Sequence, residues 1–444
     1  MPSRTIAAIA TPPGAGGVAL VRVSGGGASA IVRRLTDLKT LEPNTIKPCR
    51  FFRAGGREKL DRGLLAFFRA PHSYTGEDTA EFNCHGSPYL AQEILAEILQ
   101  AGARLAAPGE FTKRAFLAGK LDLTQAEAVA EMLNAGSELQ LKLALKHLDG
   151  DVAGAVRALR QDMLKTLAEL EAALDYPEEI ADPPPDKIAA RLEAAQKTID
   201  RLLADSKQGL CLQAGAVVVL AGRTNTGKSS LFNALLKYER AIVTELPGTT
   251  RDALEADLAL NGARIKLVDT AGLRQTDDRL ENLGIARSRA YLQSADLILF
   301  LLDAAAGITA EDKKILELIQ NKNHLVVLNK ADLPPAPNIL DGLKISARTG
   351  AGLAELAKKI LEKLGLQNID LQQNIYIGSL RQQEKLWRAK TQLEKTASGL
   401  KTAEYLDLLA VGLKNIVLAL GEITGEETSE EILAEIFQNF CVGK

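Results

Sequence analysis

The sequence lacks several features that would place it in particular classes of protein. It holds only four cysteines in 444 residues, without a Cys-x-x-Cys pair, which argues against a disulfide framework or structural zinc and fits a reducing cytoplasm. No stretch reaches the roughly 18 uninterrupted apolar residues of a membrane span, and no signal-peptide hydrophobic region is present near the start. The net charge of −2 provides no general attraction for nucleic acid, so an RNA contact must be local or come from a partner. We therefore expect a cytoplasmic protein.

The composition that remains suits a multidomain globular protein. Hydrophobic residues make up 46% and charged residues 25% of the chain, and the length predicts about two to four domains. Residues 1–118 combine short apolar or alternating runs, as at 6–10, 18–23 and 64–68, with turns rich in glycine and proline. This pattern predicts a compact N-terminal α+β domain.

The periodicity of the apolar residues changes twice along the rest of the chain. It is helical in residues 119–213 and again in 373–444. Residues 214–372 alternate apolar strands with helices, which predicts a mainly parallel sheet. The expected strands of this part are 216–220, 265–268, 297–302, 325–328 and 343–345. The expected fold class is multidomain α/β: a discontinuous helical bundle built from both flanks, with an α/β domain inserted in one of its loops.

The most specific motif is Gly-x4-Gly-Lys-Ser at 222–229. It follows an expected strand and opens an expected helix, and in that context the loop's backbone N–H groups surround phosphates. Lys228 would reach the β- and γ-phosphate oxygens, and the Ser229 hydroxyl would be a ligand of Mg²⁺.

Three further motifs follow in the order expected of a Ras-like GTP-binding domain. Asp269, which ends a strand, can hold the Mg²⁺ shell, and the Gly272 N–H can meet the γ-phosphate. Asp332, in Asn-Lys-Ala-Asp, offers two acceptor oxygens to the N1–H and N2–H₂ groups of guanine. Adenine has no donors at these positions, and a site of this kind rejects the wrong ligand by roughly 10⁴-fold. Residues 346–348 fit the loop behind the base, and Thr250 is the natural second hydroxyl on Mg²⁺.

The residues expected to contact GTP are the following: Asn225, Thr226, Gly227, Lys228, Ser229, Ser230, Thr244, Glu245, Leu246, Pro247, Gly248, Thr249, Thr250, Asp269, Thr270, Ala271, Gly272, Asn329, Lys330, Ala331, Asp332, Ser346, Ala347 and Arg348.

Hydrolysis cannot follow the Ras arrangement in every detail. The position after Asp-x-x-Gly, where Ras-like enzymes carry a glutamine that orients water, is Leu273. Another residue must orient the water, and the segment 274–281 offers several candidates between which chemistry alone does not choose. Asn225 adds a carbonyl oxygen beside the β-phosphate, which could help to bind a monovalent cation in place of an arginine finger.

Further motifs are spread along the whole chain: Thr-Pro-Pro-Gly at 11–14, Tyr-Thr-Gly-Glu-Asp at 74–78, Pro-Gly-Glu-Phe at 108–111, Lys-Leu-Asp-Leu at 120–123 and the C-terminal Cys-Val-Gly-Lys. Together with the nucleotide motifs, they resemble the MnmE (TrmE) family of tRNA-modification GTPases. The resemblance implies a homodimer that acts with MnmG (GidA), an FAD protein. The pair would install an aminomethyl or carboxymethylaminomethyl group at C5 of the wobble uridine of certain tRNAs, with a formyl- or methylene-tetrahydrofolate as one-carbon donor.

The family also implies roles for single residues. Glu281 would position the attacking water. K⁺ would be bound by Asn225 and by the loop 244–249, and would support hydrolysis as two G domains meet; the ligands from that loop would be Thr244, Leu246 and Thr249. The folate site would be formed between protomers, and the residues that match it are Arg22, Glu81, Lys120 and Lys444.

Some residues and one alternative function stay open. Thr224 and Val442 replace the proline and isoleucine usual in the family, the chemistry of Cys441 does not follow from its position, and we expect His85 to be structural. The competing hypothesis is a GTP-regulated assembly factor or ribosome-associated protein whose flanking domains only bind partners.

Overall fold

A computed structural model describes residues 4–56, 58–238, 255–269, 290–401, 406–438 and 440–443. The chain forms two compact units, one of residues 1–130 with 421–444 and one of residues 131–420. Within the described residues, no helix is both long enough and apolar enough to cross a membrane.

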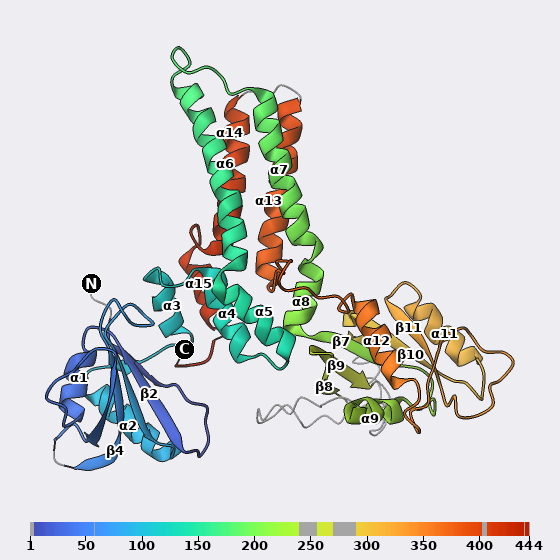
Figure 1. Cartoon of the computed structure of the whole chain (residues 1–444), viewed down its shortest axis with the longest axis horizontal. Coiled ribbons are helices and arrows are strands. Elements are labelled where there is room, and N and C mark those ends of the chain that lie inside the picture. The colour runs from blue at the N-terminus through green and yellow to red at the C-terminus, as the bar shows by residue number, and fades with distance from the viewer. Residues whose placement is uncertain are drawn as a thin grey trace. The chain divides into compact units, whose positions relative to one another are not determined.

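The N-terminal unit is built on a six-stranded sheet in the order β3-β4-β5-β2-β1-β6, in which only β1 and β6 run parallel (Figure 1). Its strands are β1 (Ile6–Ile9), β2 (Val18–Ser24), β3 (Thr45–Phe52), β4 (Lys59–Phe68), β5 (Thr79–His85) and β6 (Arg104–Leu105). Helices α1 (Ala28–Leu35) and α2 (Pro88–Gln100) pack on one face. Sequence analysis found parts of β1, β2 and β4 but missed β3 and β5.

Alternation along β2 explains why the two faces of this sheet differ. Ala19, Val21 and Val23 are buried against α1 and α2, because successive side chains of a strand point to opposite faces. Arg22 therefore lies on the other face, with Val18, which is 62% exposed. Part of that second face is covered by α3 (Glu110–Leu117), whose Phe111 is buried against β1.

The C-terminal segment completes the same unit. Helix α15 (Glu430–Gln438) packs on α4 (Leu123–Leu133) through a cluster that includes Leu433, Phe437 and Leu123. Gly443 follows in a left-handed conformation at φ 97°, and a Cβ there would lie 2.6 Å from the carbonyl oxygen of Ile9. The close approach of the tail to β1 therefore requires glycine.

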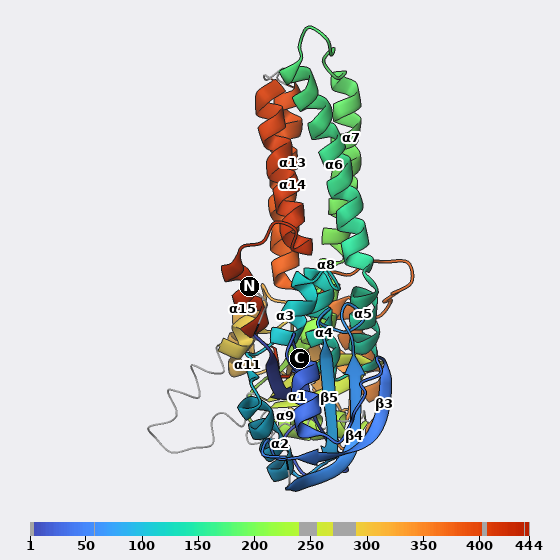
Figure 2. The ribbon, with the colours of Figure 1, turned by 90° about the vertical axis from the view of Figure 1, so that its left-hand side faces the viewer.

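The second unit contains four long helices that lie side by side in Figures 1 and 2. They are α6 (Asp151–Asp175), α7 (Pro185–Ala204), α13 (Leu380–Lys401) and α14 (Leu406–Thr424). Three consecutive prolines at 183–185 follow the end of α6, and α7 starts at the last of them, because proline is tolerated in the first turn of a helix but not in its interior. Since α13 packs along α7, the bundle is built from both flanks of the inserted domain, as predicted.

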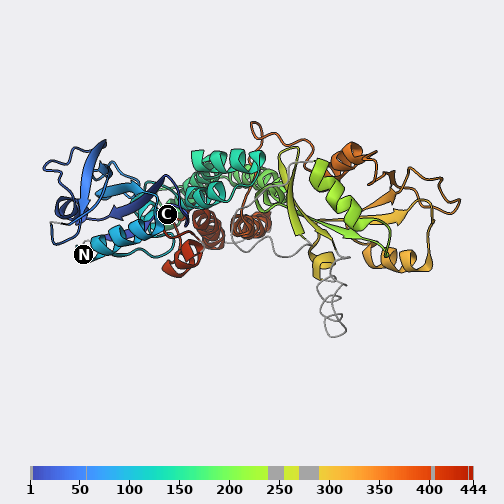
Figure 3. The same ribbon diagram turned by 90° about the horizontal axis from the view of Figure 1, so that it is seen from below.

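The inserted domain has a sheet in the order β12-β11-β10-β7-β9-β8, parallel except for the β8–β9 pair. Its strands are β7 (Ala216–Ala221), β8 (Glu255–Leu260), β9 (Ala263–Asp269), β10 (Leu297–Asp303), β11 (His324–Asn329) and β12 (Leu343–Lys344). Helices α9 (Lys228–Tyr238) and α12 (Leu353–Leu364) cover one face and α11 (Ala310–Ile319) the other, as Figure 3 shows from below. The predicted mainly parallel sheet is confirmed.

Helices α5 (Glu138–Asp149) and α8 (Ser206–Ala214) join this domain to the bundle. Leu143 of α5 and Leu212 of α8 are buried in one cluster with residues of β7, β8 and β9. The amide nitrogen of Gln140 donates from its side chain to the carbonyl oxygen of Gln213 at 2.8 Å. His147 contacts the carbonyl oxygen of Tyr376, in the segment that leaves the domain, through Nε2 at 2.8 Å.

Candidate functional site

The loop between β7 and α9 is organised around the ammonium group of Lys228. This buried group donates to the carbonyl oxygens of Gly222 at 2.8 Å and Arg223 at 2.6 Å. Thr226 is fully buried, and its hydroxyl donates to the same Arg223 carbonyl at 3.0 Å. Asn225 is exposed and takes a left-handed φ of 62°, which asparagine tolerates better than most residues. The loop thus holds one positive charge at the N-terminus of a helix, an arrangement suited to phosphate.

Two hard oxygen ligands meet beside this loop. The Ser229 hydroxyl, at the start of α9, donates to the Asp269 carboxylate, at the end of β9, at 2.7 Å. Asp269 is 4% exposed. Neighbouring parallel strands β7 and β9 bring the two residues to the same edge of the sheet, where loops follow the carboxyl ends of the strands. A hydroxyl and a carboxylate are a donor set that fits Mg²⁺.

Asn329 ties the phosphate loop to the second half of the site. Its side-chain amide donates to the carbonyl oxygen of Thr226 at 2.9 Å, and its Oδ1 accepts from the Ala347 N–H at 3.0 Å. The side chain is almost fully buried at the end of β11. Asn329 therefore links two loops that are distant in the chain, lying 103 residues after Thr226 and 18 residues before Ala347.

The carboxylate of Asp332 is held ready to accept hydrogen bonds. The Ser346 hydroxyl donates to one oxygen at 2.6 Å, and Arg348 lies 2.7 Å from the other. The hydroxyl above all, and then the nearby backbone N–H and Arg348, lower the pKa of Asp332. Lys330 Nζ lies 2.6 Å from Asp303 Oδ2. Burial would raise the pKa of the Asp303 carboxyl, but Lys330 and two backbone N–H groups outweigh this effect, so the pKa is lowered.

The structure describes only part of the expected nucleotide contacts. It brings together the phosphate loop, Asp269, the 329–332 motif and the 346–348 loop. Ser230 and Ala331 are exposed to solvent. The expected water-positioning Glu281 lies outside the described residues. So do Thr244, Glu245, Leu246, Pro247, Gly248, Thr249, Thr250, Thr270, Ala271 and Gly272.

A second polar cluster lies on the face of the N-terminal sheet that α3 partly covers. Arg22 and Glu81 are direct cross-strand partners on β2 and β5, and Arg22 Nε lies 2.9 Å from Glu81 Oε1. The guanidinium also stacks on the Phe111 ring at 5.7 Å from its centroid. Tyr74 shares a hydrogen bond of 3.0 Å with Thr112 and lies close enough to Arg22 to interact electrostatically with its positive charge.

The C-terminal tail reaches this cluster. Arg22 Nη1 donates to the carbonyl oxygen of Gly443 at 3.1 Å, a contact between residues 421 positions apart. The Gly109 N–H donates to the carbonyl oxygen of Cys441 at 3.4 Å. Lys444 follows Gly443 but lies outside the described residues, and Lys120 is exposed at the end of the turn after α3. The structure thus joins two of the four expected folate residues and leads the tail to them.

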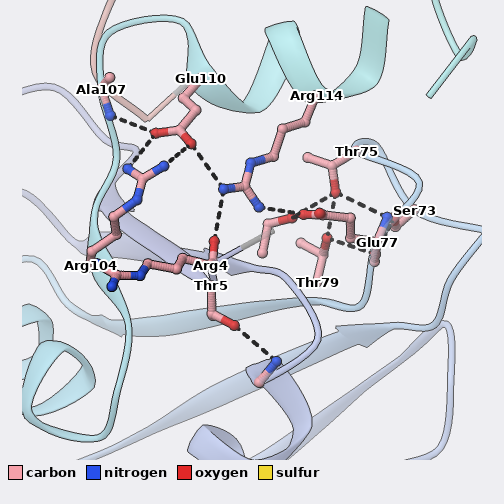
Figure 4. Close-up of polar contacts among 12 residues, drawn as sticks. Arg4, Thr5, Ser73, Thr75, Glu77, Thr79, Arg104, Ala107, Glu110 and Arg114 are labelled. Carbon is pink, nitrogen blue, oxygen red and sulfur yellow. Dashed lines mark hydrogen bonds and ion pairs between the residues drawn. The ribbon is translucent and has the colours of Figure 1, made fainter. Parts of the chain in front are cut away.

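The acidic residues of two N-terminal motifs belong to a network that supports this face (Figure 4). Arg114 on α3 contacts Glu77 at 2.7 Å and Glu110 at 2.9 Å, while Arg104 also pairs with Glu110. Glu77 in turn accepts from the Ser24 hydroxyl at 2.9 Å. Burial would raise the pKa of Glu110, but hydrogen bonds from Arg104, the Ala107 N–H and Arg114 outweigh it and lower the pKa to about 2.

Sequence reasoning missed these supporting residues because their partners are distant in the chain. Arg114 and Thr112 carry no motif of their own, and only the folded chain places them beside Glu77 and Tyr74. The sequence signal was the presence of acidic residues inside the motifs at 74–78 and 108–111, which does not identify their arginine partners.

Comparison with known proteins covers nearly the whole chain. A family model described as GTP-binding protein TrmE N-terminus matches residues 5–120, and the MnmE helical domain model matches residues 123–441. The curated tRNA modification GTPase MnmE of Aquifex aeolicus is 45% identical over 451 residues, covering 99% of this chain and 99% of that protein. The protein of the same name from Carboxydothermus hydrogenoformans is 41% identical, again with 99% of both chains covered. A crystal structure of Aquifex aeolicus Era bound to GDP.AlF4- aligns with 40% of this chain and 66% of its own, with 29% identity and a TM-score of 0.28.

Proposed function

The chain belongs to the MnmE family of tRNA modification GTPases, and from this we propose that it hydrolyses GTP while modifying C5 of the wobble uridine of certain tRNAs. The observation that carries the proposal is the presence of two separate polar sites. One, around Lys228 and Asp332, suits a guanine nucleotide. The other, around Arg22 and Glu81, lies in a different unit and suits a small charged cofactor.

In the nucleotide site each group has a distinct part. Lys228 and the loop N–H groups would bind phosphate oxygens, and Ser229 with Thr250 would hold Mg²⁺, aided by Asp269. Asp332 would accept from N1–H and N2–H₂ of guanine, with its carboxylate kept ionised by Ser346 and Arg348. Asn329 would keep the two halves in register through its bonds to Thr226 and Ala347.

Hydrolysis is proposed to depend on Glu281 and on K⁺. Glu281 would orient water, because Leu273 cannot do so. K⁺, when bound, supplies the positive charge that other GTPases take from an arginine. Its proposed ligands, Asn225 and oxygens of the loop 244–249, would be completed as two G domains meet.

The sheet face around Arg22 is proposed as a tetrahydrofolate site at a homodimer interface. Arginine and lysine suit the folate carboxylates, and Glu81 can accept from pterin N–H groups. The same face exposes three large apolar side chains: Val18 is 62%, Ile46 66% and Leu64 47% exposed. Exposed apolar patches of this kind are typical of interaction surfaces. MnmG (GidA) would be the partner that completes the modification, in the cytoplasm.

The decisive experiment is nucleoside analysis of tRNA from cells that lack this protein. We expect the C5 side chain of the wobble uridine to be absent and to return when the intact gene is supplied. Unchanged tRNA nucleosides would overturn the proposed function. Calorimetry with 5-formyl-tetrahydrofolate tests the cofactor separately, since an absence of binding heat would favour a partner-binding role for the flanking domains.

The cation mechanism has its own test. GTP turnover should be several-fold faster in KCl than in NaCl at equal ionic strength, and Glu281→Ala should bind GTP normally yet hydrolyse it at least about a hundredfold more slowly. Equal rates in the two salts would remove K⁺ from the mechanism, and wild-type turnover of the variant would remove Glu281.

A further inference from the structure

The phosphate loop is held from its outer side by an ion pair between Arg223, a variable position of the loop motif, and Asp312, which belongs to none of the nucleotide motifs. Arg223 Nε lies 3.3 Å from Asp312 Oδ2. The arginine side chain is 20% exposed, whereas the aspartate is fully buried. Charges are rarely buried without a partner, because removing a carboxylate from water costs several kcal/mol. The burial of Asp312 therefore makes its cationic neighbour important.

Asp312 is itself rigidly placed by the start of α11. Its Oδ2 accepts from the backbone N–H of Thr309 at 3.0 Å and from the Thr309 hydroxyl at 2.7 Å, and its own N–H donates back to that hydroxyl. This is a capping box, and it locates the carboxylate at the positive end of the helix dipole. Among the described residues, Oδ1 of Asp312 and Nε of Arg223 are both buried without a hydrogen-bond partner, so the contact between the two side chains is an ion pair and not a hydrogen bond.

The other end of the pair reaches the centre of the phosphate loop. The carbonyl oxygen of Arg223 accepts from Lys228 Nζ and from the Thr226 hydroxyl. A contact that restrains Arg223 therefore also restrains the carbonyl oxygen that accepts the hydrogen bonds of Lys228 and Thr226. The side chain of Arg223 is fixed by a helix on the opposite face of the sheet from α9.

We propose that Asp312 is a positioning residue for the phosphates of the nucleotide, acting through Arg223 on the carbonyl that orients Lys228 and Thr226. The inference rests on the proposed nucleotide site. It assigns to α11 a part in nucleotide affinity that the four sequence motifs do not contain.

A double-mutant cycle tests the proposal. Asp312→Asn keeps the shape and a capping oxygen but removes the charge, and Arg223→Gln removes the cation. Each single variant should release a fluorescent GDP analogue about tenfold faster and raise KM for GTP, with a smaller change in kcat. The double variant should be no worse than either single one, because coupled residues are not additive. Arg223→Lys, which keeps a cation, should recover part of the loss.

The matched control is Glu311→Gln, which removes an exposed carboxylate from the same first turn of α11. It should leave GDP release unchanged, since it alters the helix-end charge but not the pair. Multiplicative effects in the double variant, or wild-type release from Asp312→Asn, would overturn the role of Asp312. If Asp312→Asn does not fold, the two Arg223 variants decide: equally accelerated GDP release by Arg223→Lys and Arg223→Gln would also overturn the role of Asp312. Undiminished GDP binding by Lys228→Ala would instead overturn the nucleotide site itself.

Discussion

Gly227 illustrates how a single residue type can be required by its neighbours. It adopts φ 92°, a conformation that side chains disfavour, and a Cβ there would collide with the side-chain nitrogen of Asn329. That nitrogen is the donor to the Thr226 carbonyl. A methyl group at 227 would therefore break the link between the phosphate loop and the guanine side of the site.

At the same scale, Glu110 makes the N-terminal unit sensitive to acid. Its pKa in the folded chain is about 2, below the value of 4.5 for an ordinary glutamate. A carboxyl whose pKa is depressed by folding stabilises the fold fully above about pH 4.5, and this contribution is lost as the pH falls towards about 2.

We predict that Glu110→Gln lowers the free energy of unfolding of the N-terminal unit by about 2 kcal/mol at pH 7. The difference from the parent should shrink steadily between pH 5 and pH 2. Urea unfolding at several pH values measures it. The control Glu193→Gln removes one partner of an ion pair whose side chains are 73% and 67% exposed, and it should change little. A difference independent of pH would contradict the prediction.

Among the elements, α5 shows that helices assigned by periodicity to the bundle also serve the inserted domain. Its N–H at Leu139 donates to the carbonyl oxygen of Gly262 at 3.2 Å, in the turn between β8 and β9. Strand β9 ends at Asp269, so the same hairpin connects α5 with the carboxylate that is expected to hold the Mg²⁺ shell. The helix thus packs on the hairpin that carries part of the nucleotide site.

We predict that Leu143→Ala loosens this hairpin. Leu143 is 2% exposed within the shared core, and truncating such a leucine costs about 2–5 kcal/mol. Hydrogen exchange of the β8 and β9 amides should accelerate accordingly, while exchange in β2 and β5 stays the same. Leu141→Ala is the control, because Leu141 lies on the same helix but is 42% exposed. Equal acceleration by both variants would contradict the shared core.

For the whole molecule, the part of the N-terminal sheet face that exposes Val18, Ile46 and Leu64 is the surface that association would bury. These residues lie on the same face as the Arg22–Glu81 pair, so cofactor binding and dimerisation are proposed to use the same face. Pairing of two such faces would bury these apolar side chains, and full burial of each large one would stabilise the dimer by about 1.5–3 kcal/mol.

We predict that Leu64→Glu separates the proposed homodimer, because it places a charge on that face. Light scattering after size exclusion should show the mass of one chain for this variant and of two for the parent. The folded state should persist, since Leu64 is 47% exposed. Leu318→Glu, at a residue of α11 that is 74% exposed, should leave the mass unchanged. A dimeric Leu64→Glu chain would argue against this interface.

The sequence by itself determined the nucleotide motifs, the parallel sheet and the helical flanks. These depend on patterns within a short stretch: the phosphate-loop motif is eight consecutive residues, 222–229, and β10 is buried on both faces because its first six residues, 297–302, are all apolar. Strand β3 escaped detection because Pro48 breaks its alternation, so its pairing with β4 decided its conformation. Strand β5 alternates polar and apolar residues from Thr79 to His85, so its pattern was available in the sequence and was overlooked.

Only the tertiary structure decided which distant groups meet. Nothing local to Arg22 indicates a bond to Gly443, and nothing local to Arg223 indicates Asp312. Such contacts arise because burying several apolar clusters leaves few places for the polar groups at their edges, and those groups then pair with whichever partner the packing brings close. The motifs therefore identified the chemistry of the nucleotide loop, while packing supplied the residues that hold that loop and the sheet face in place.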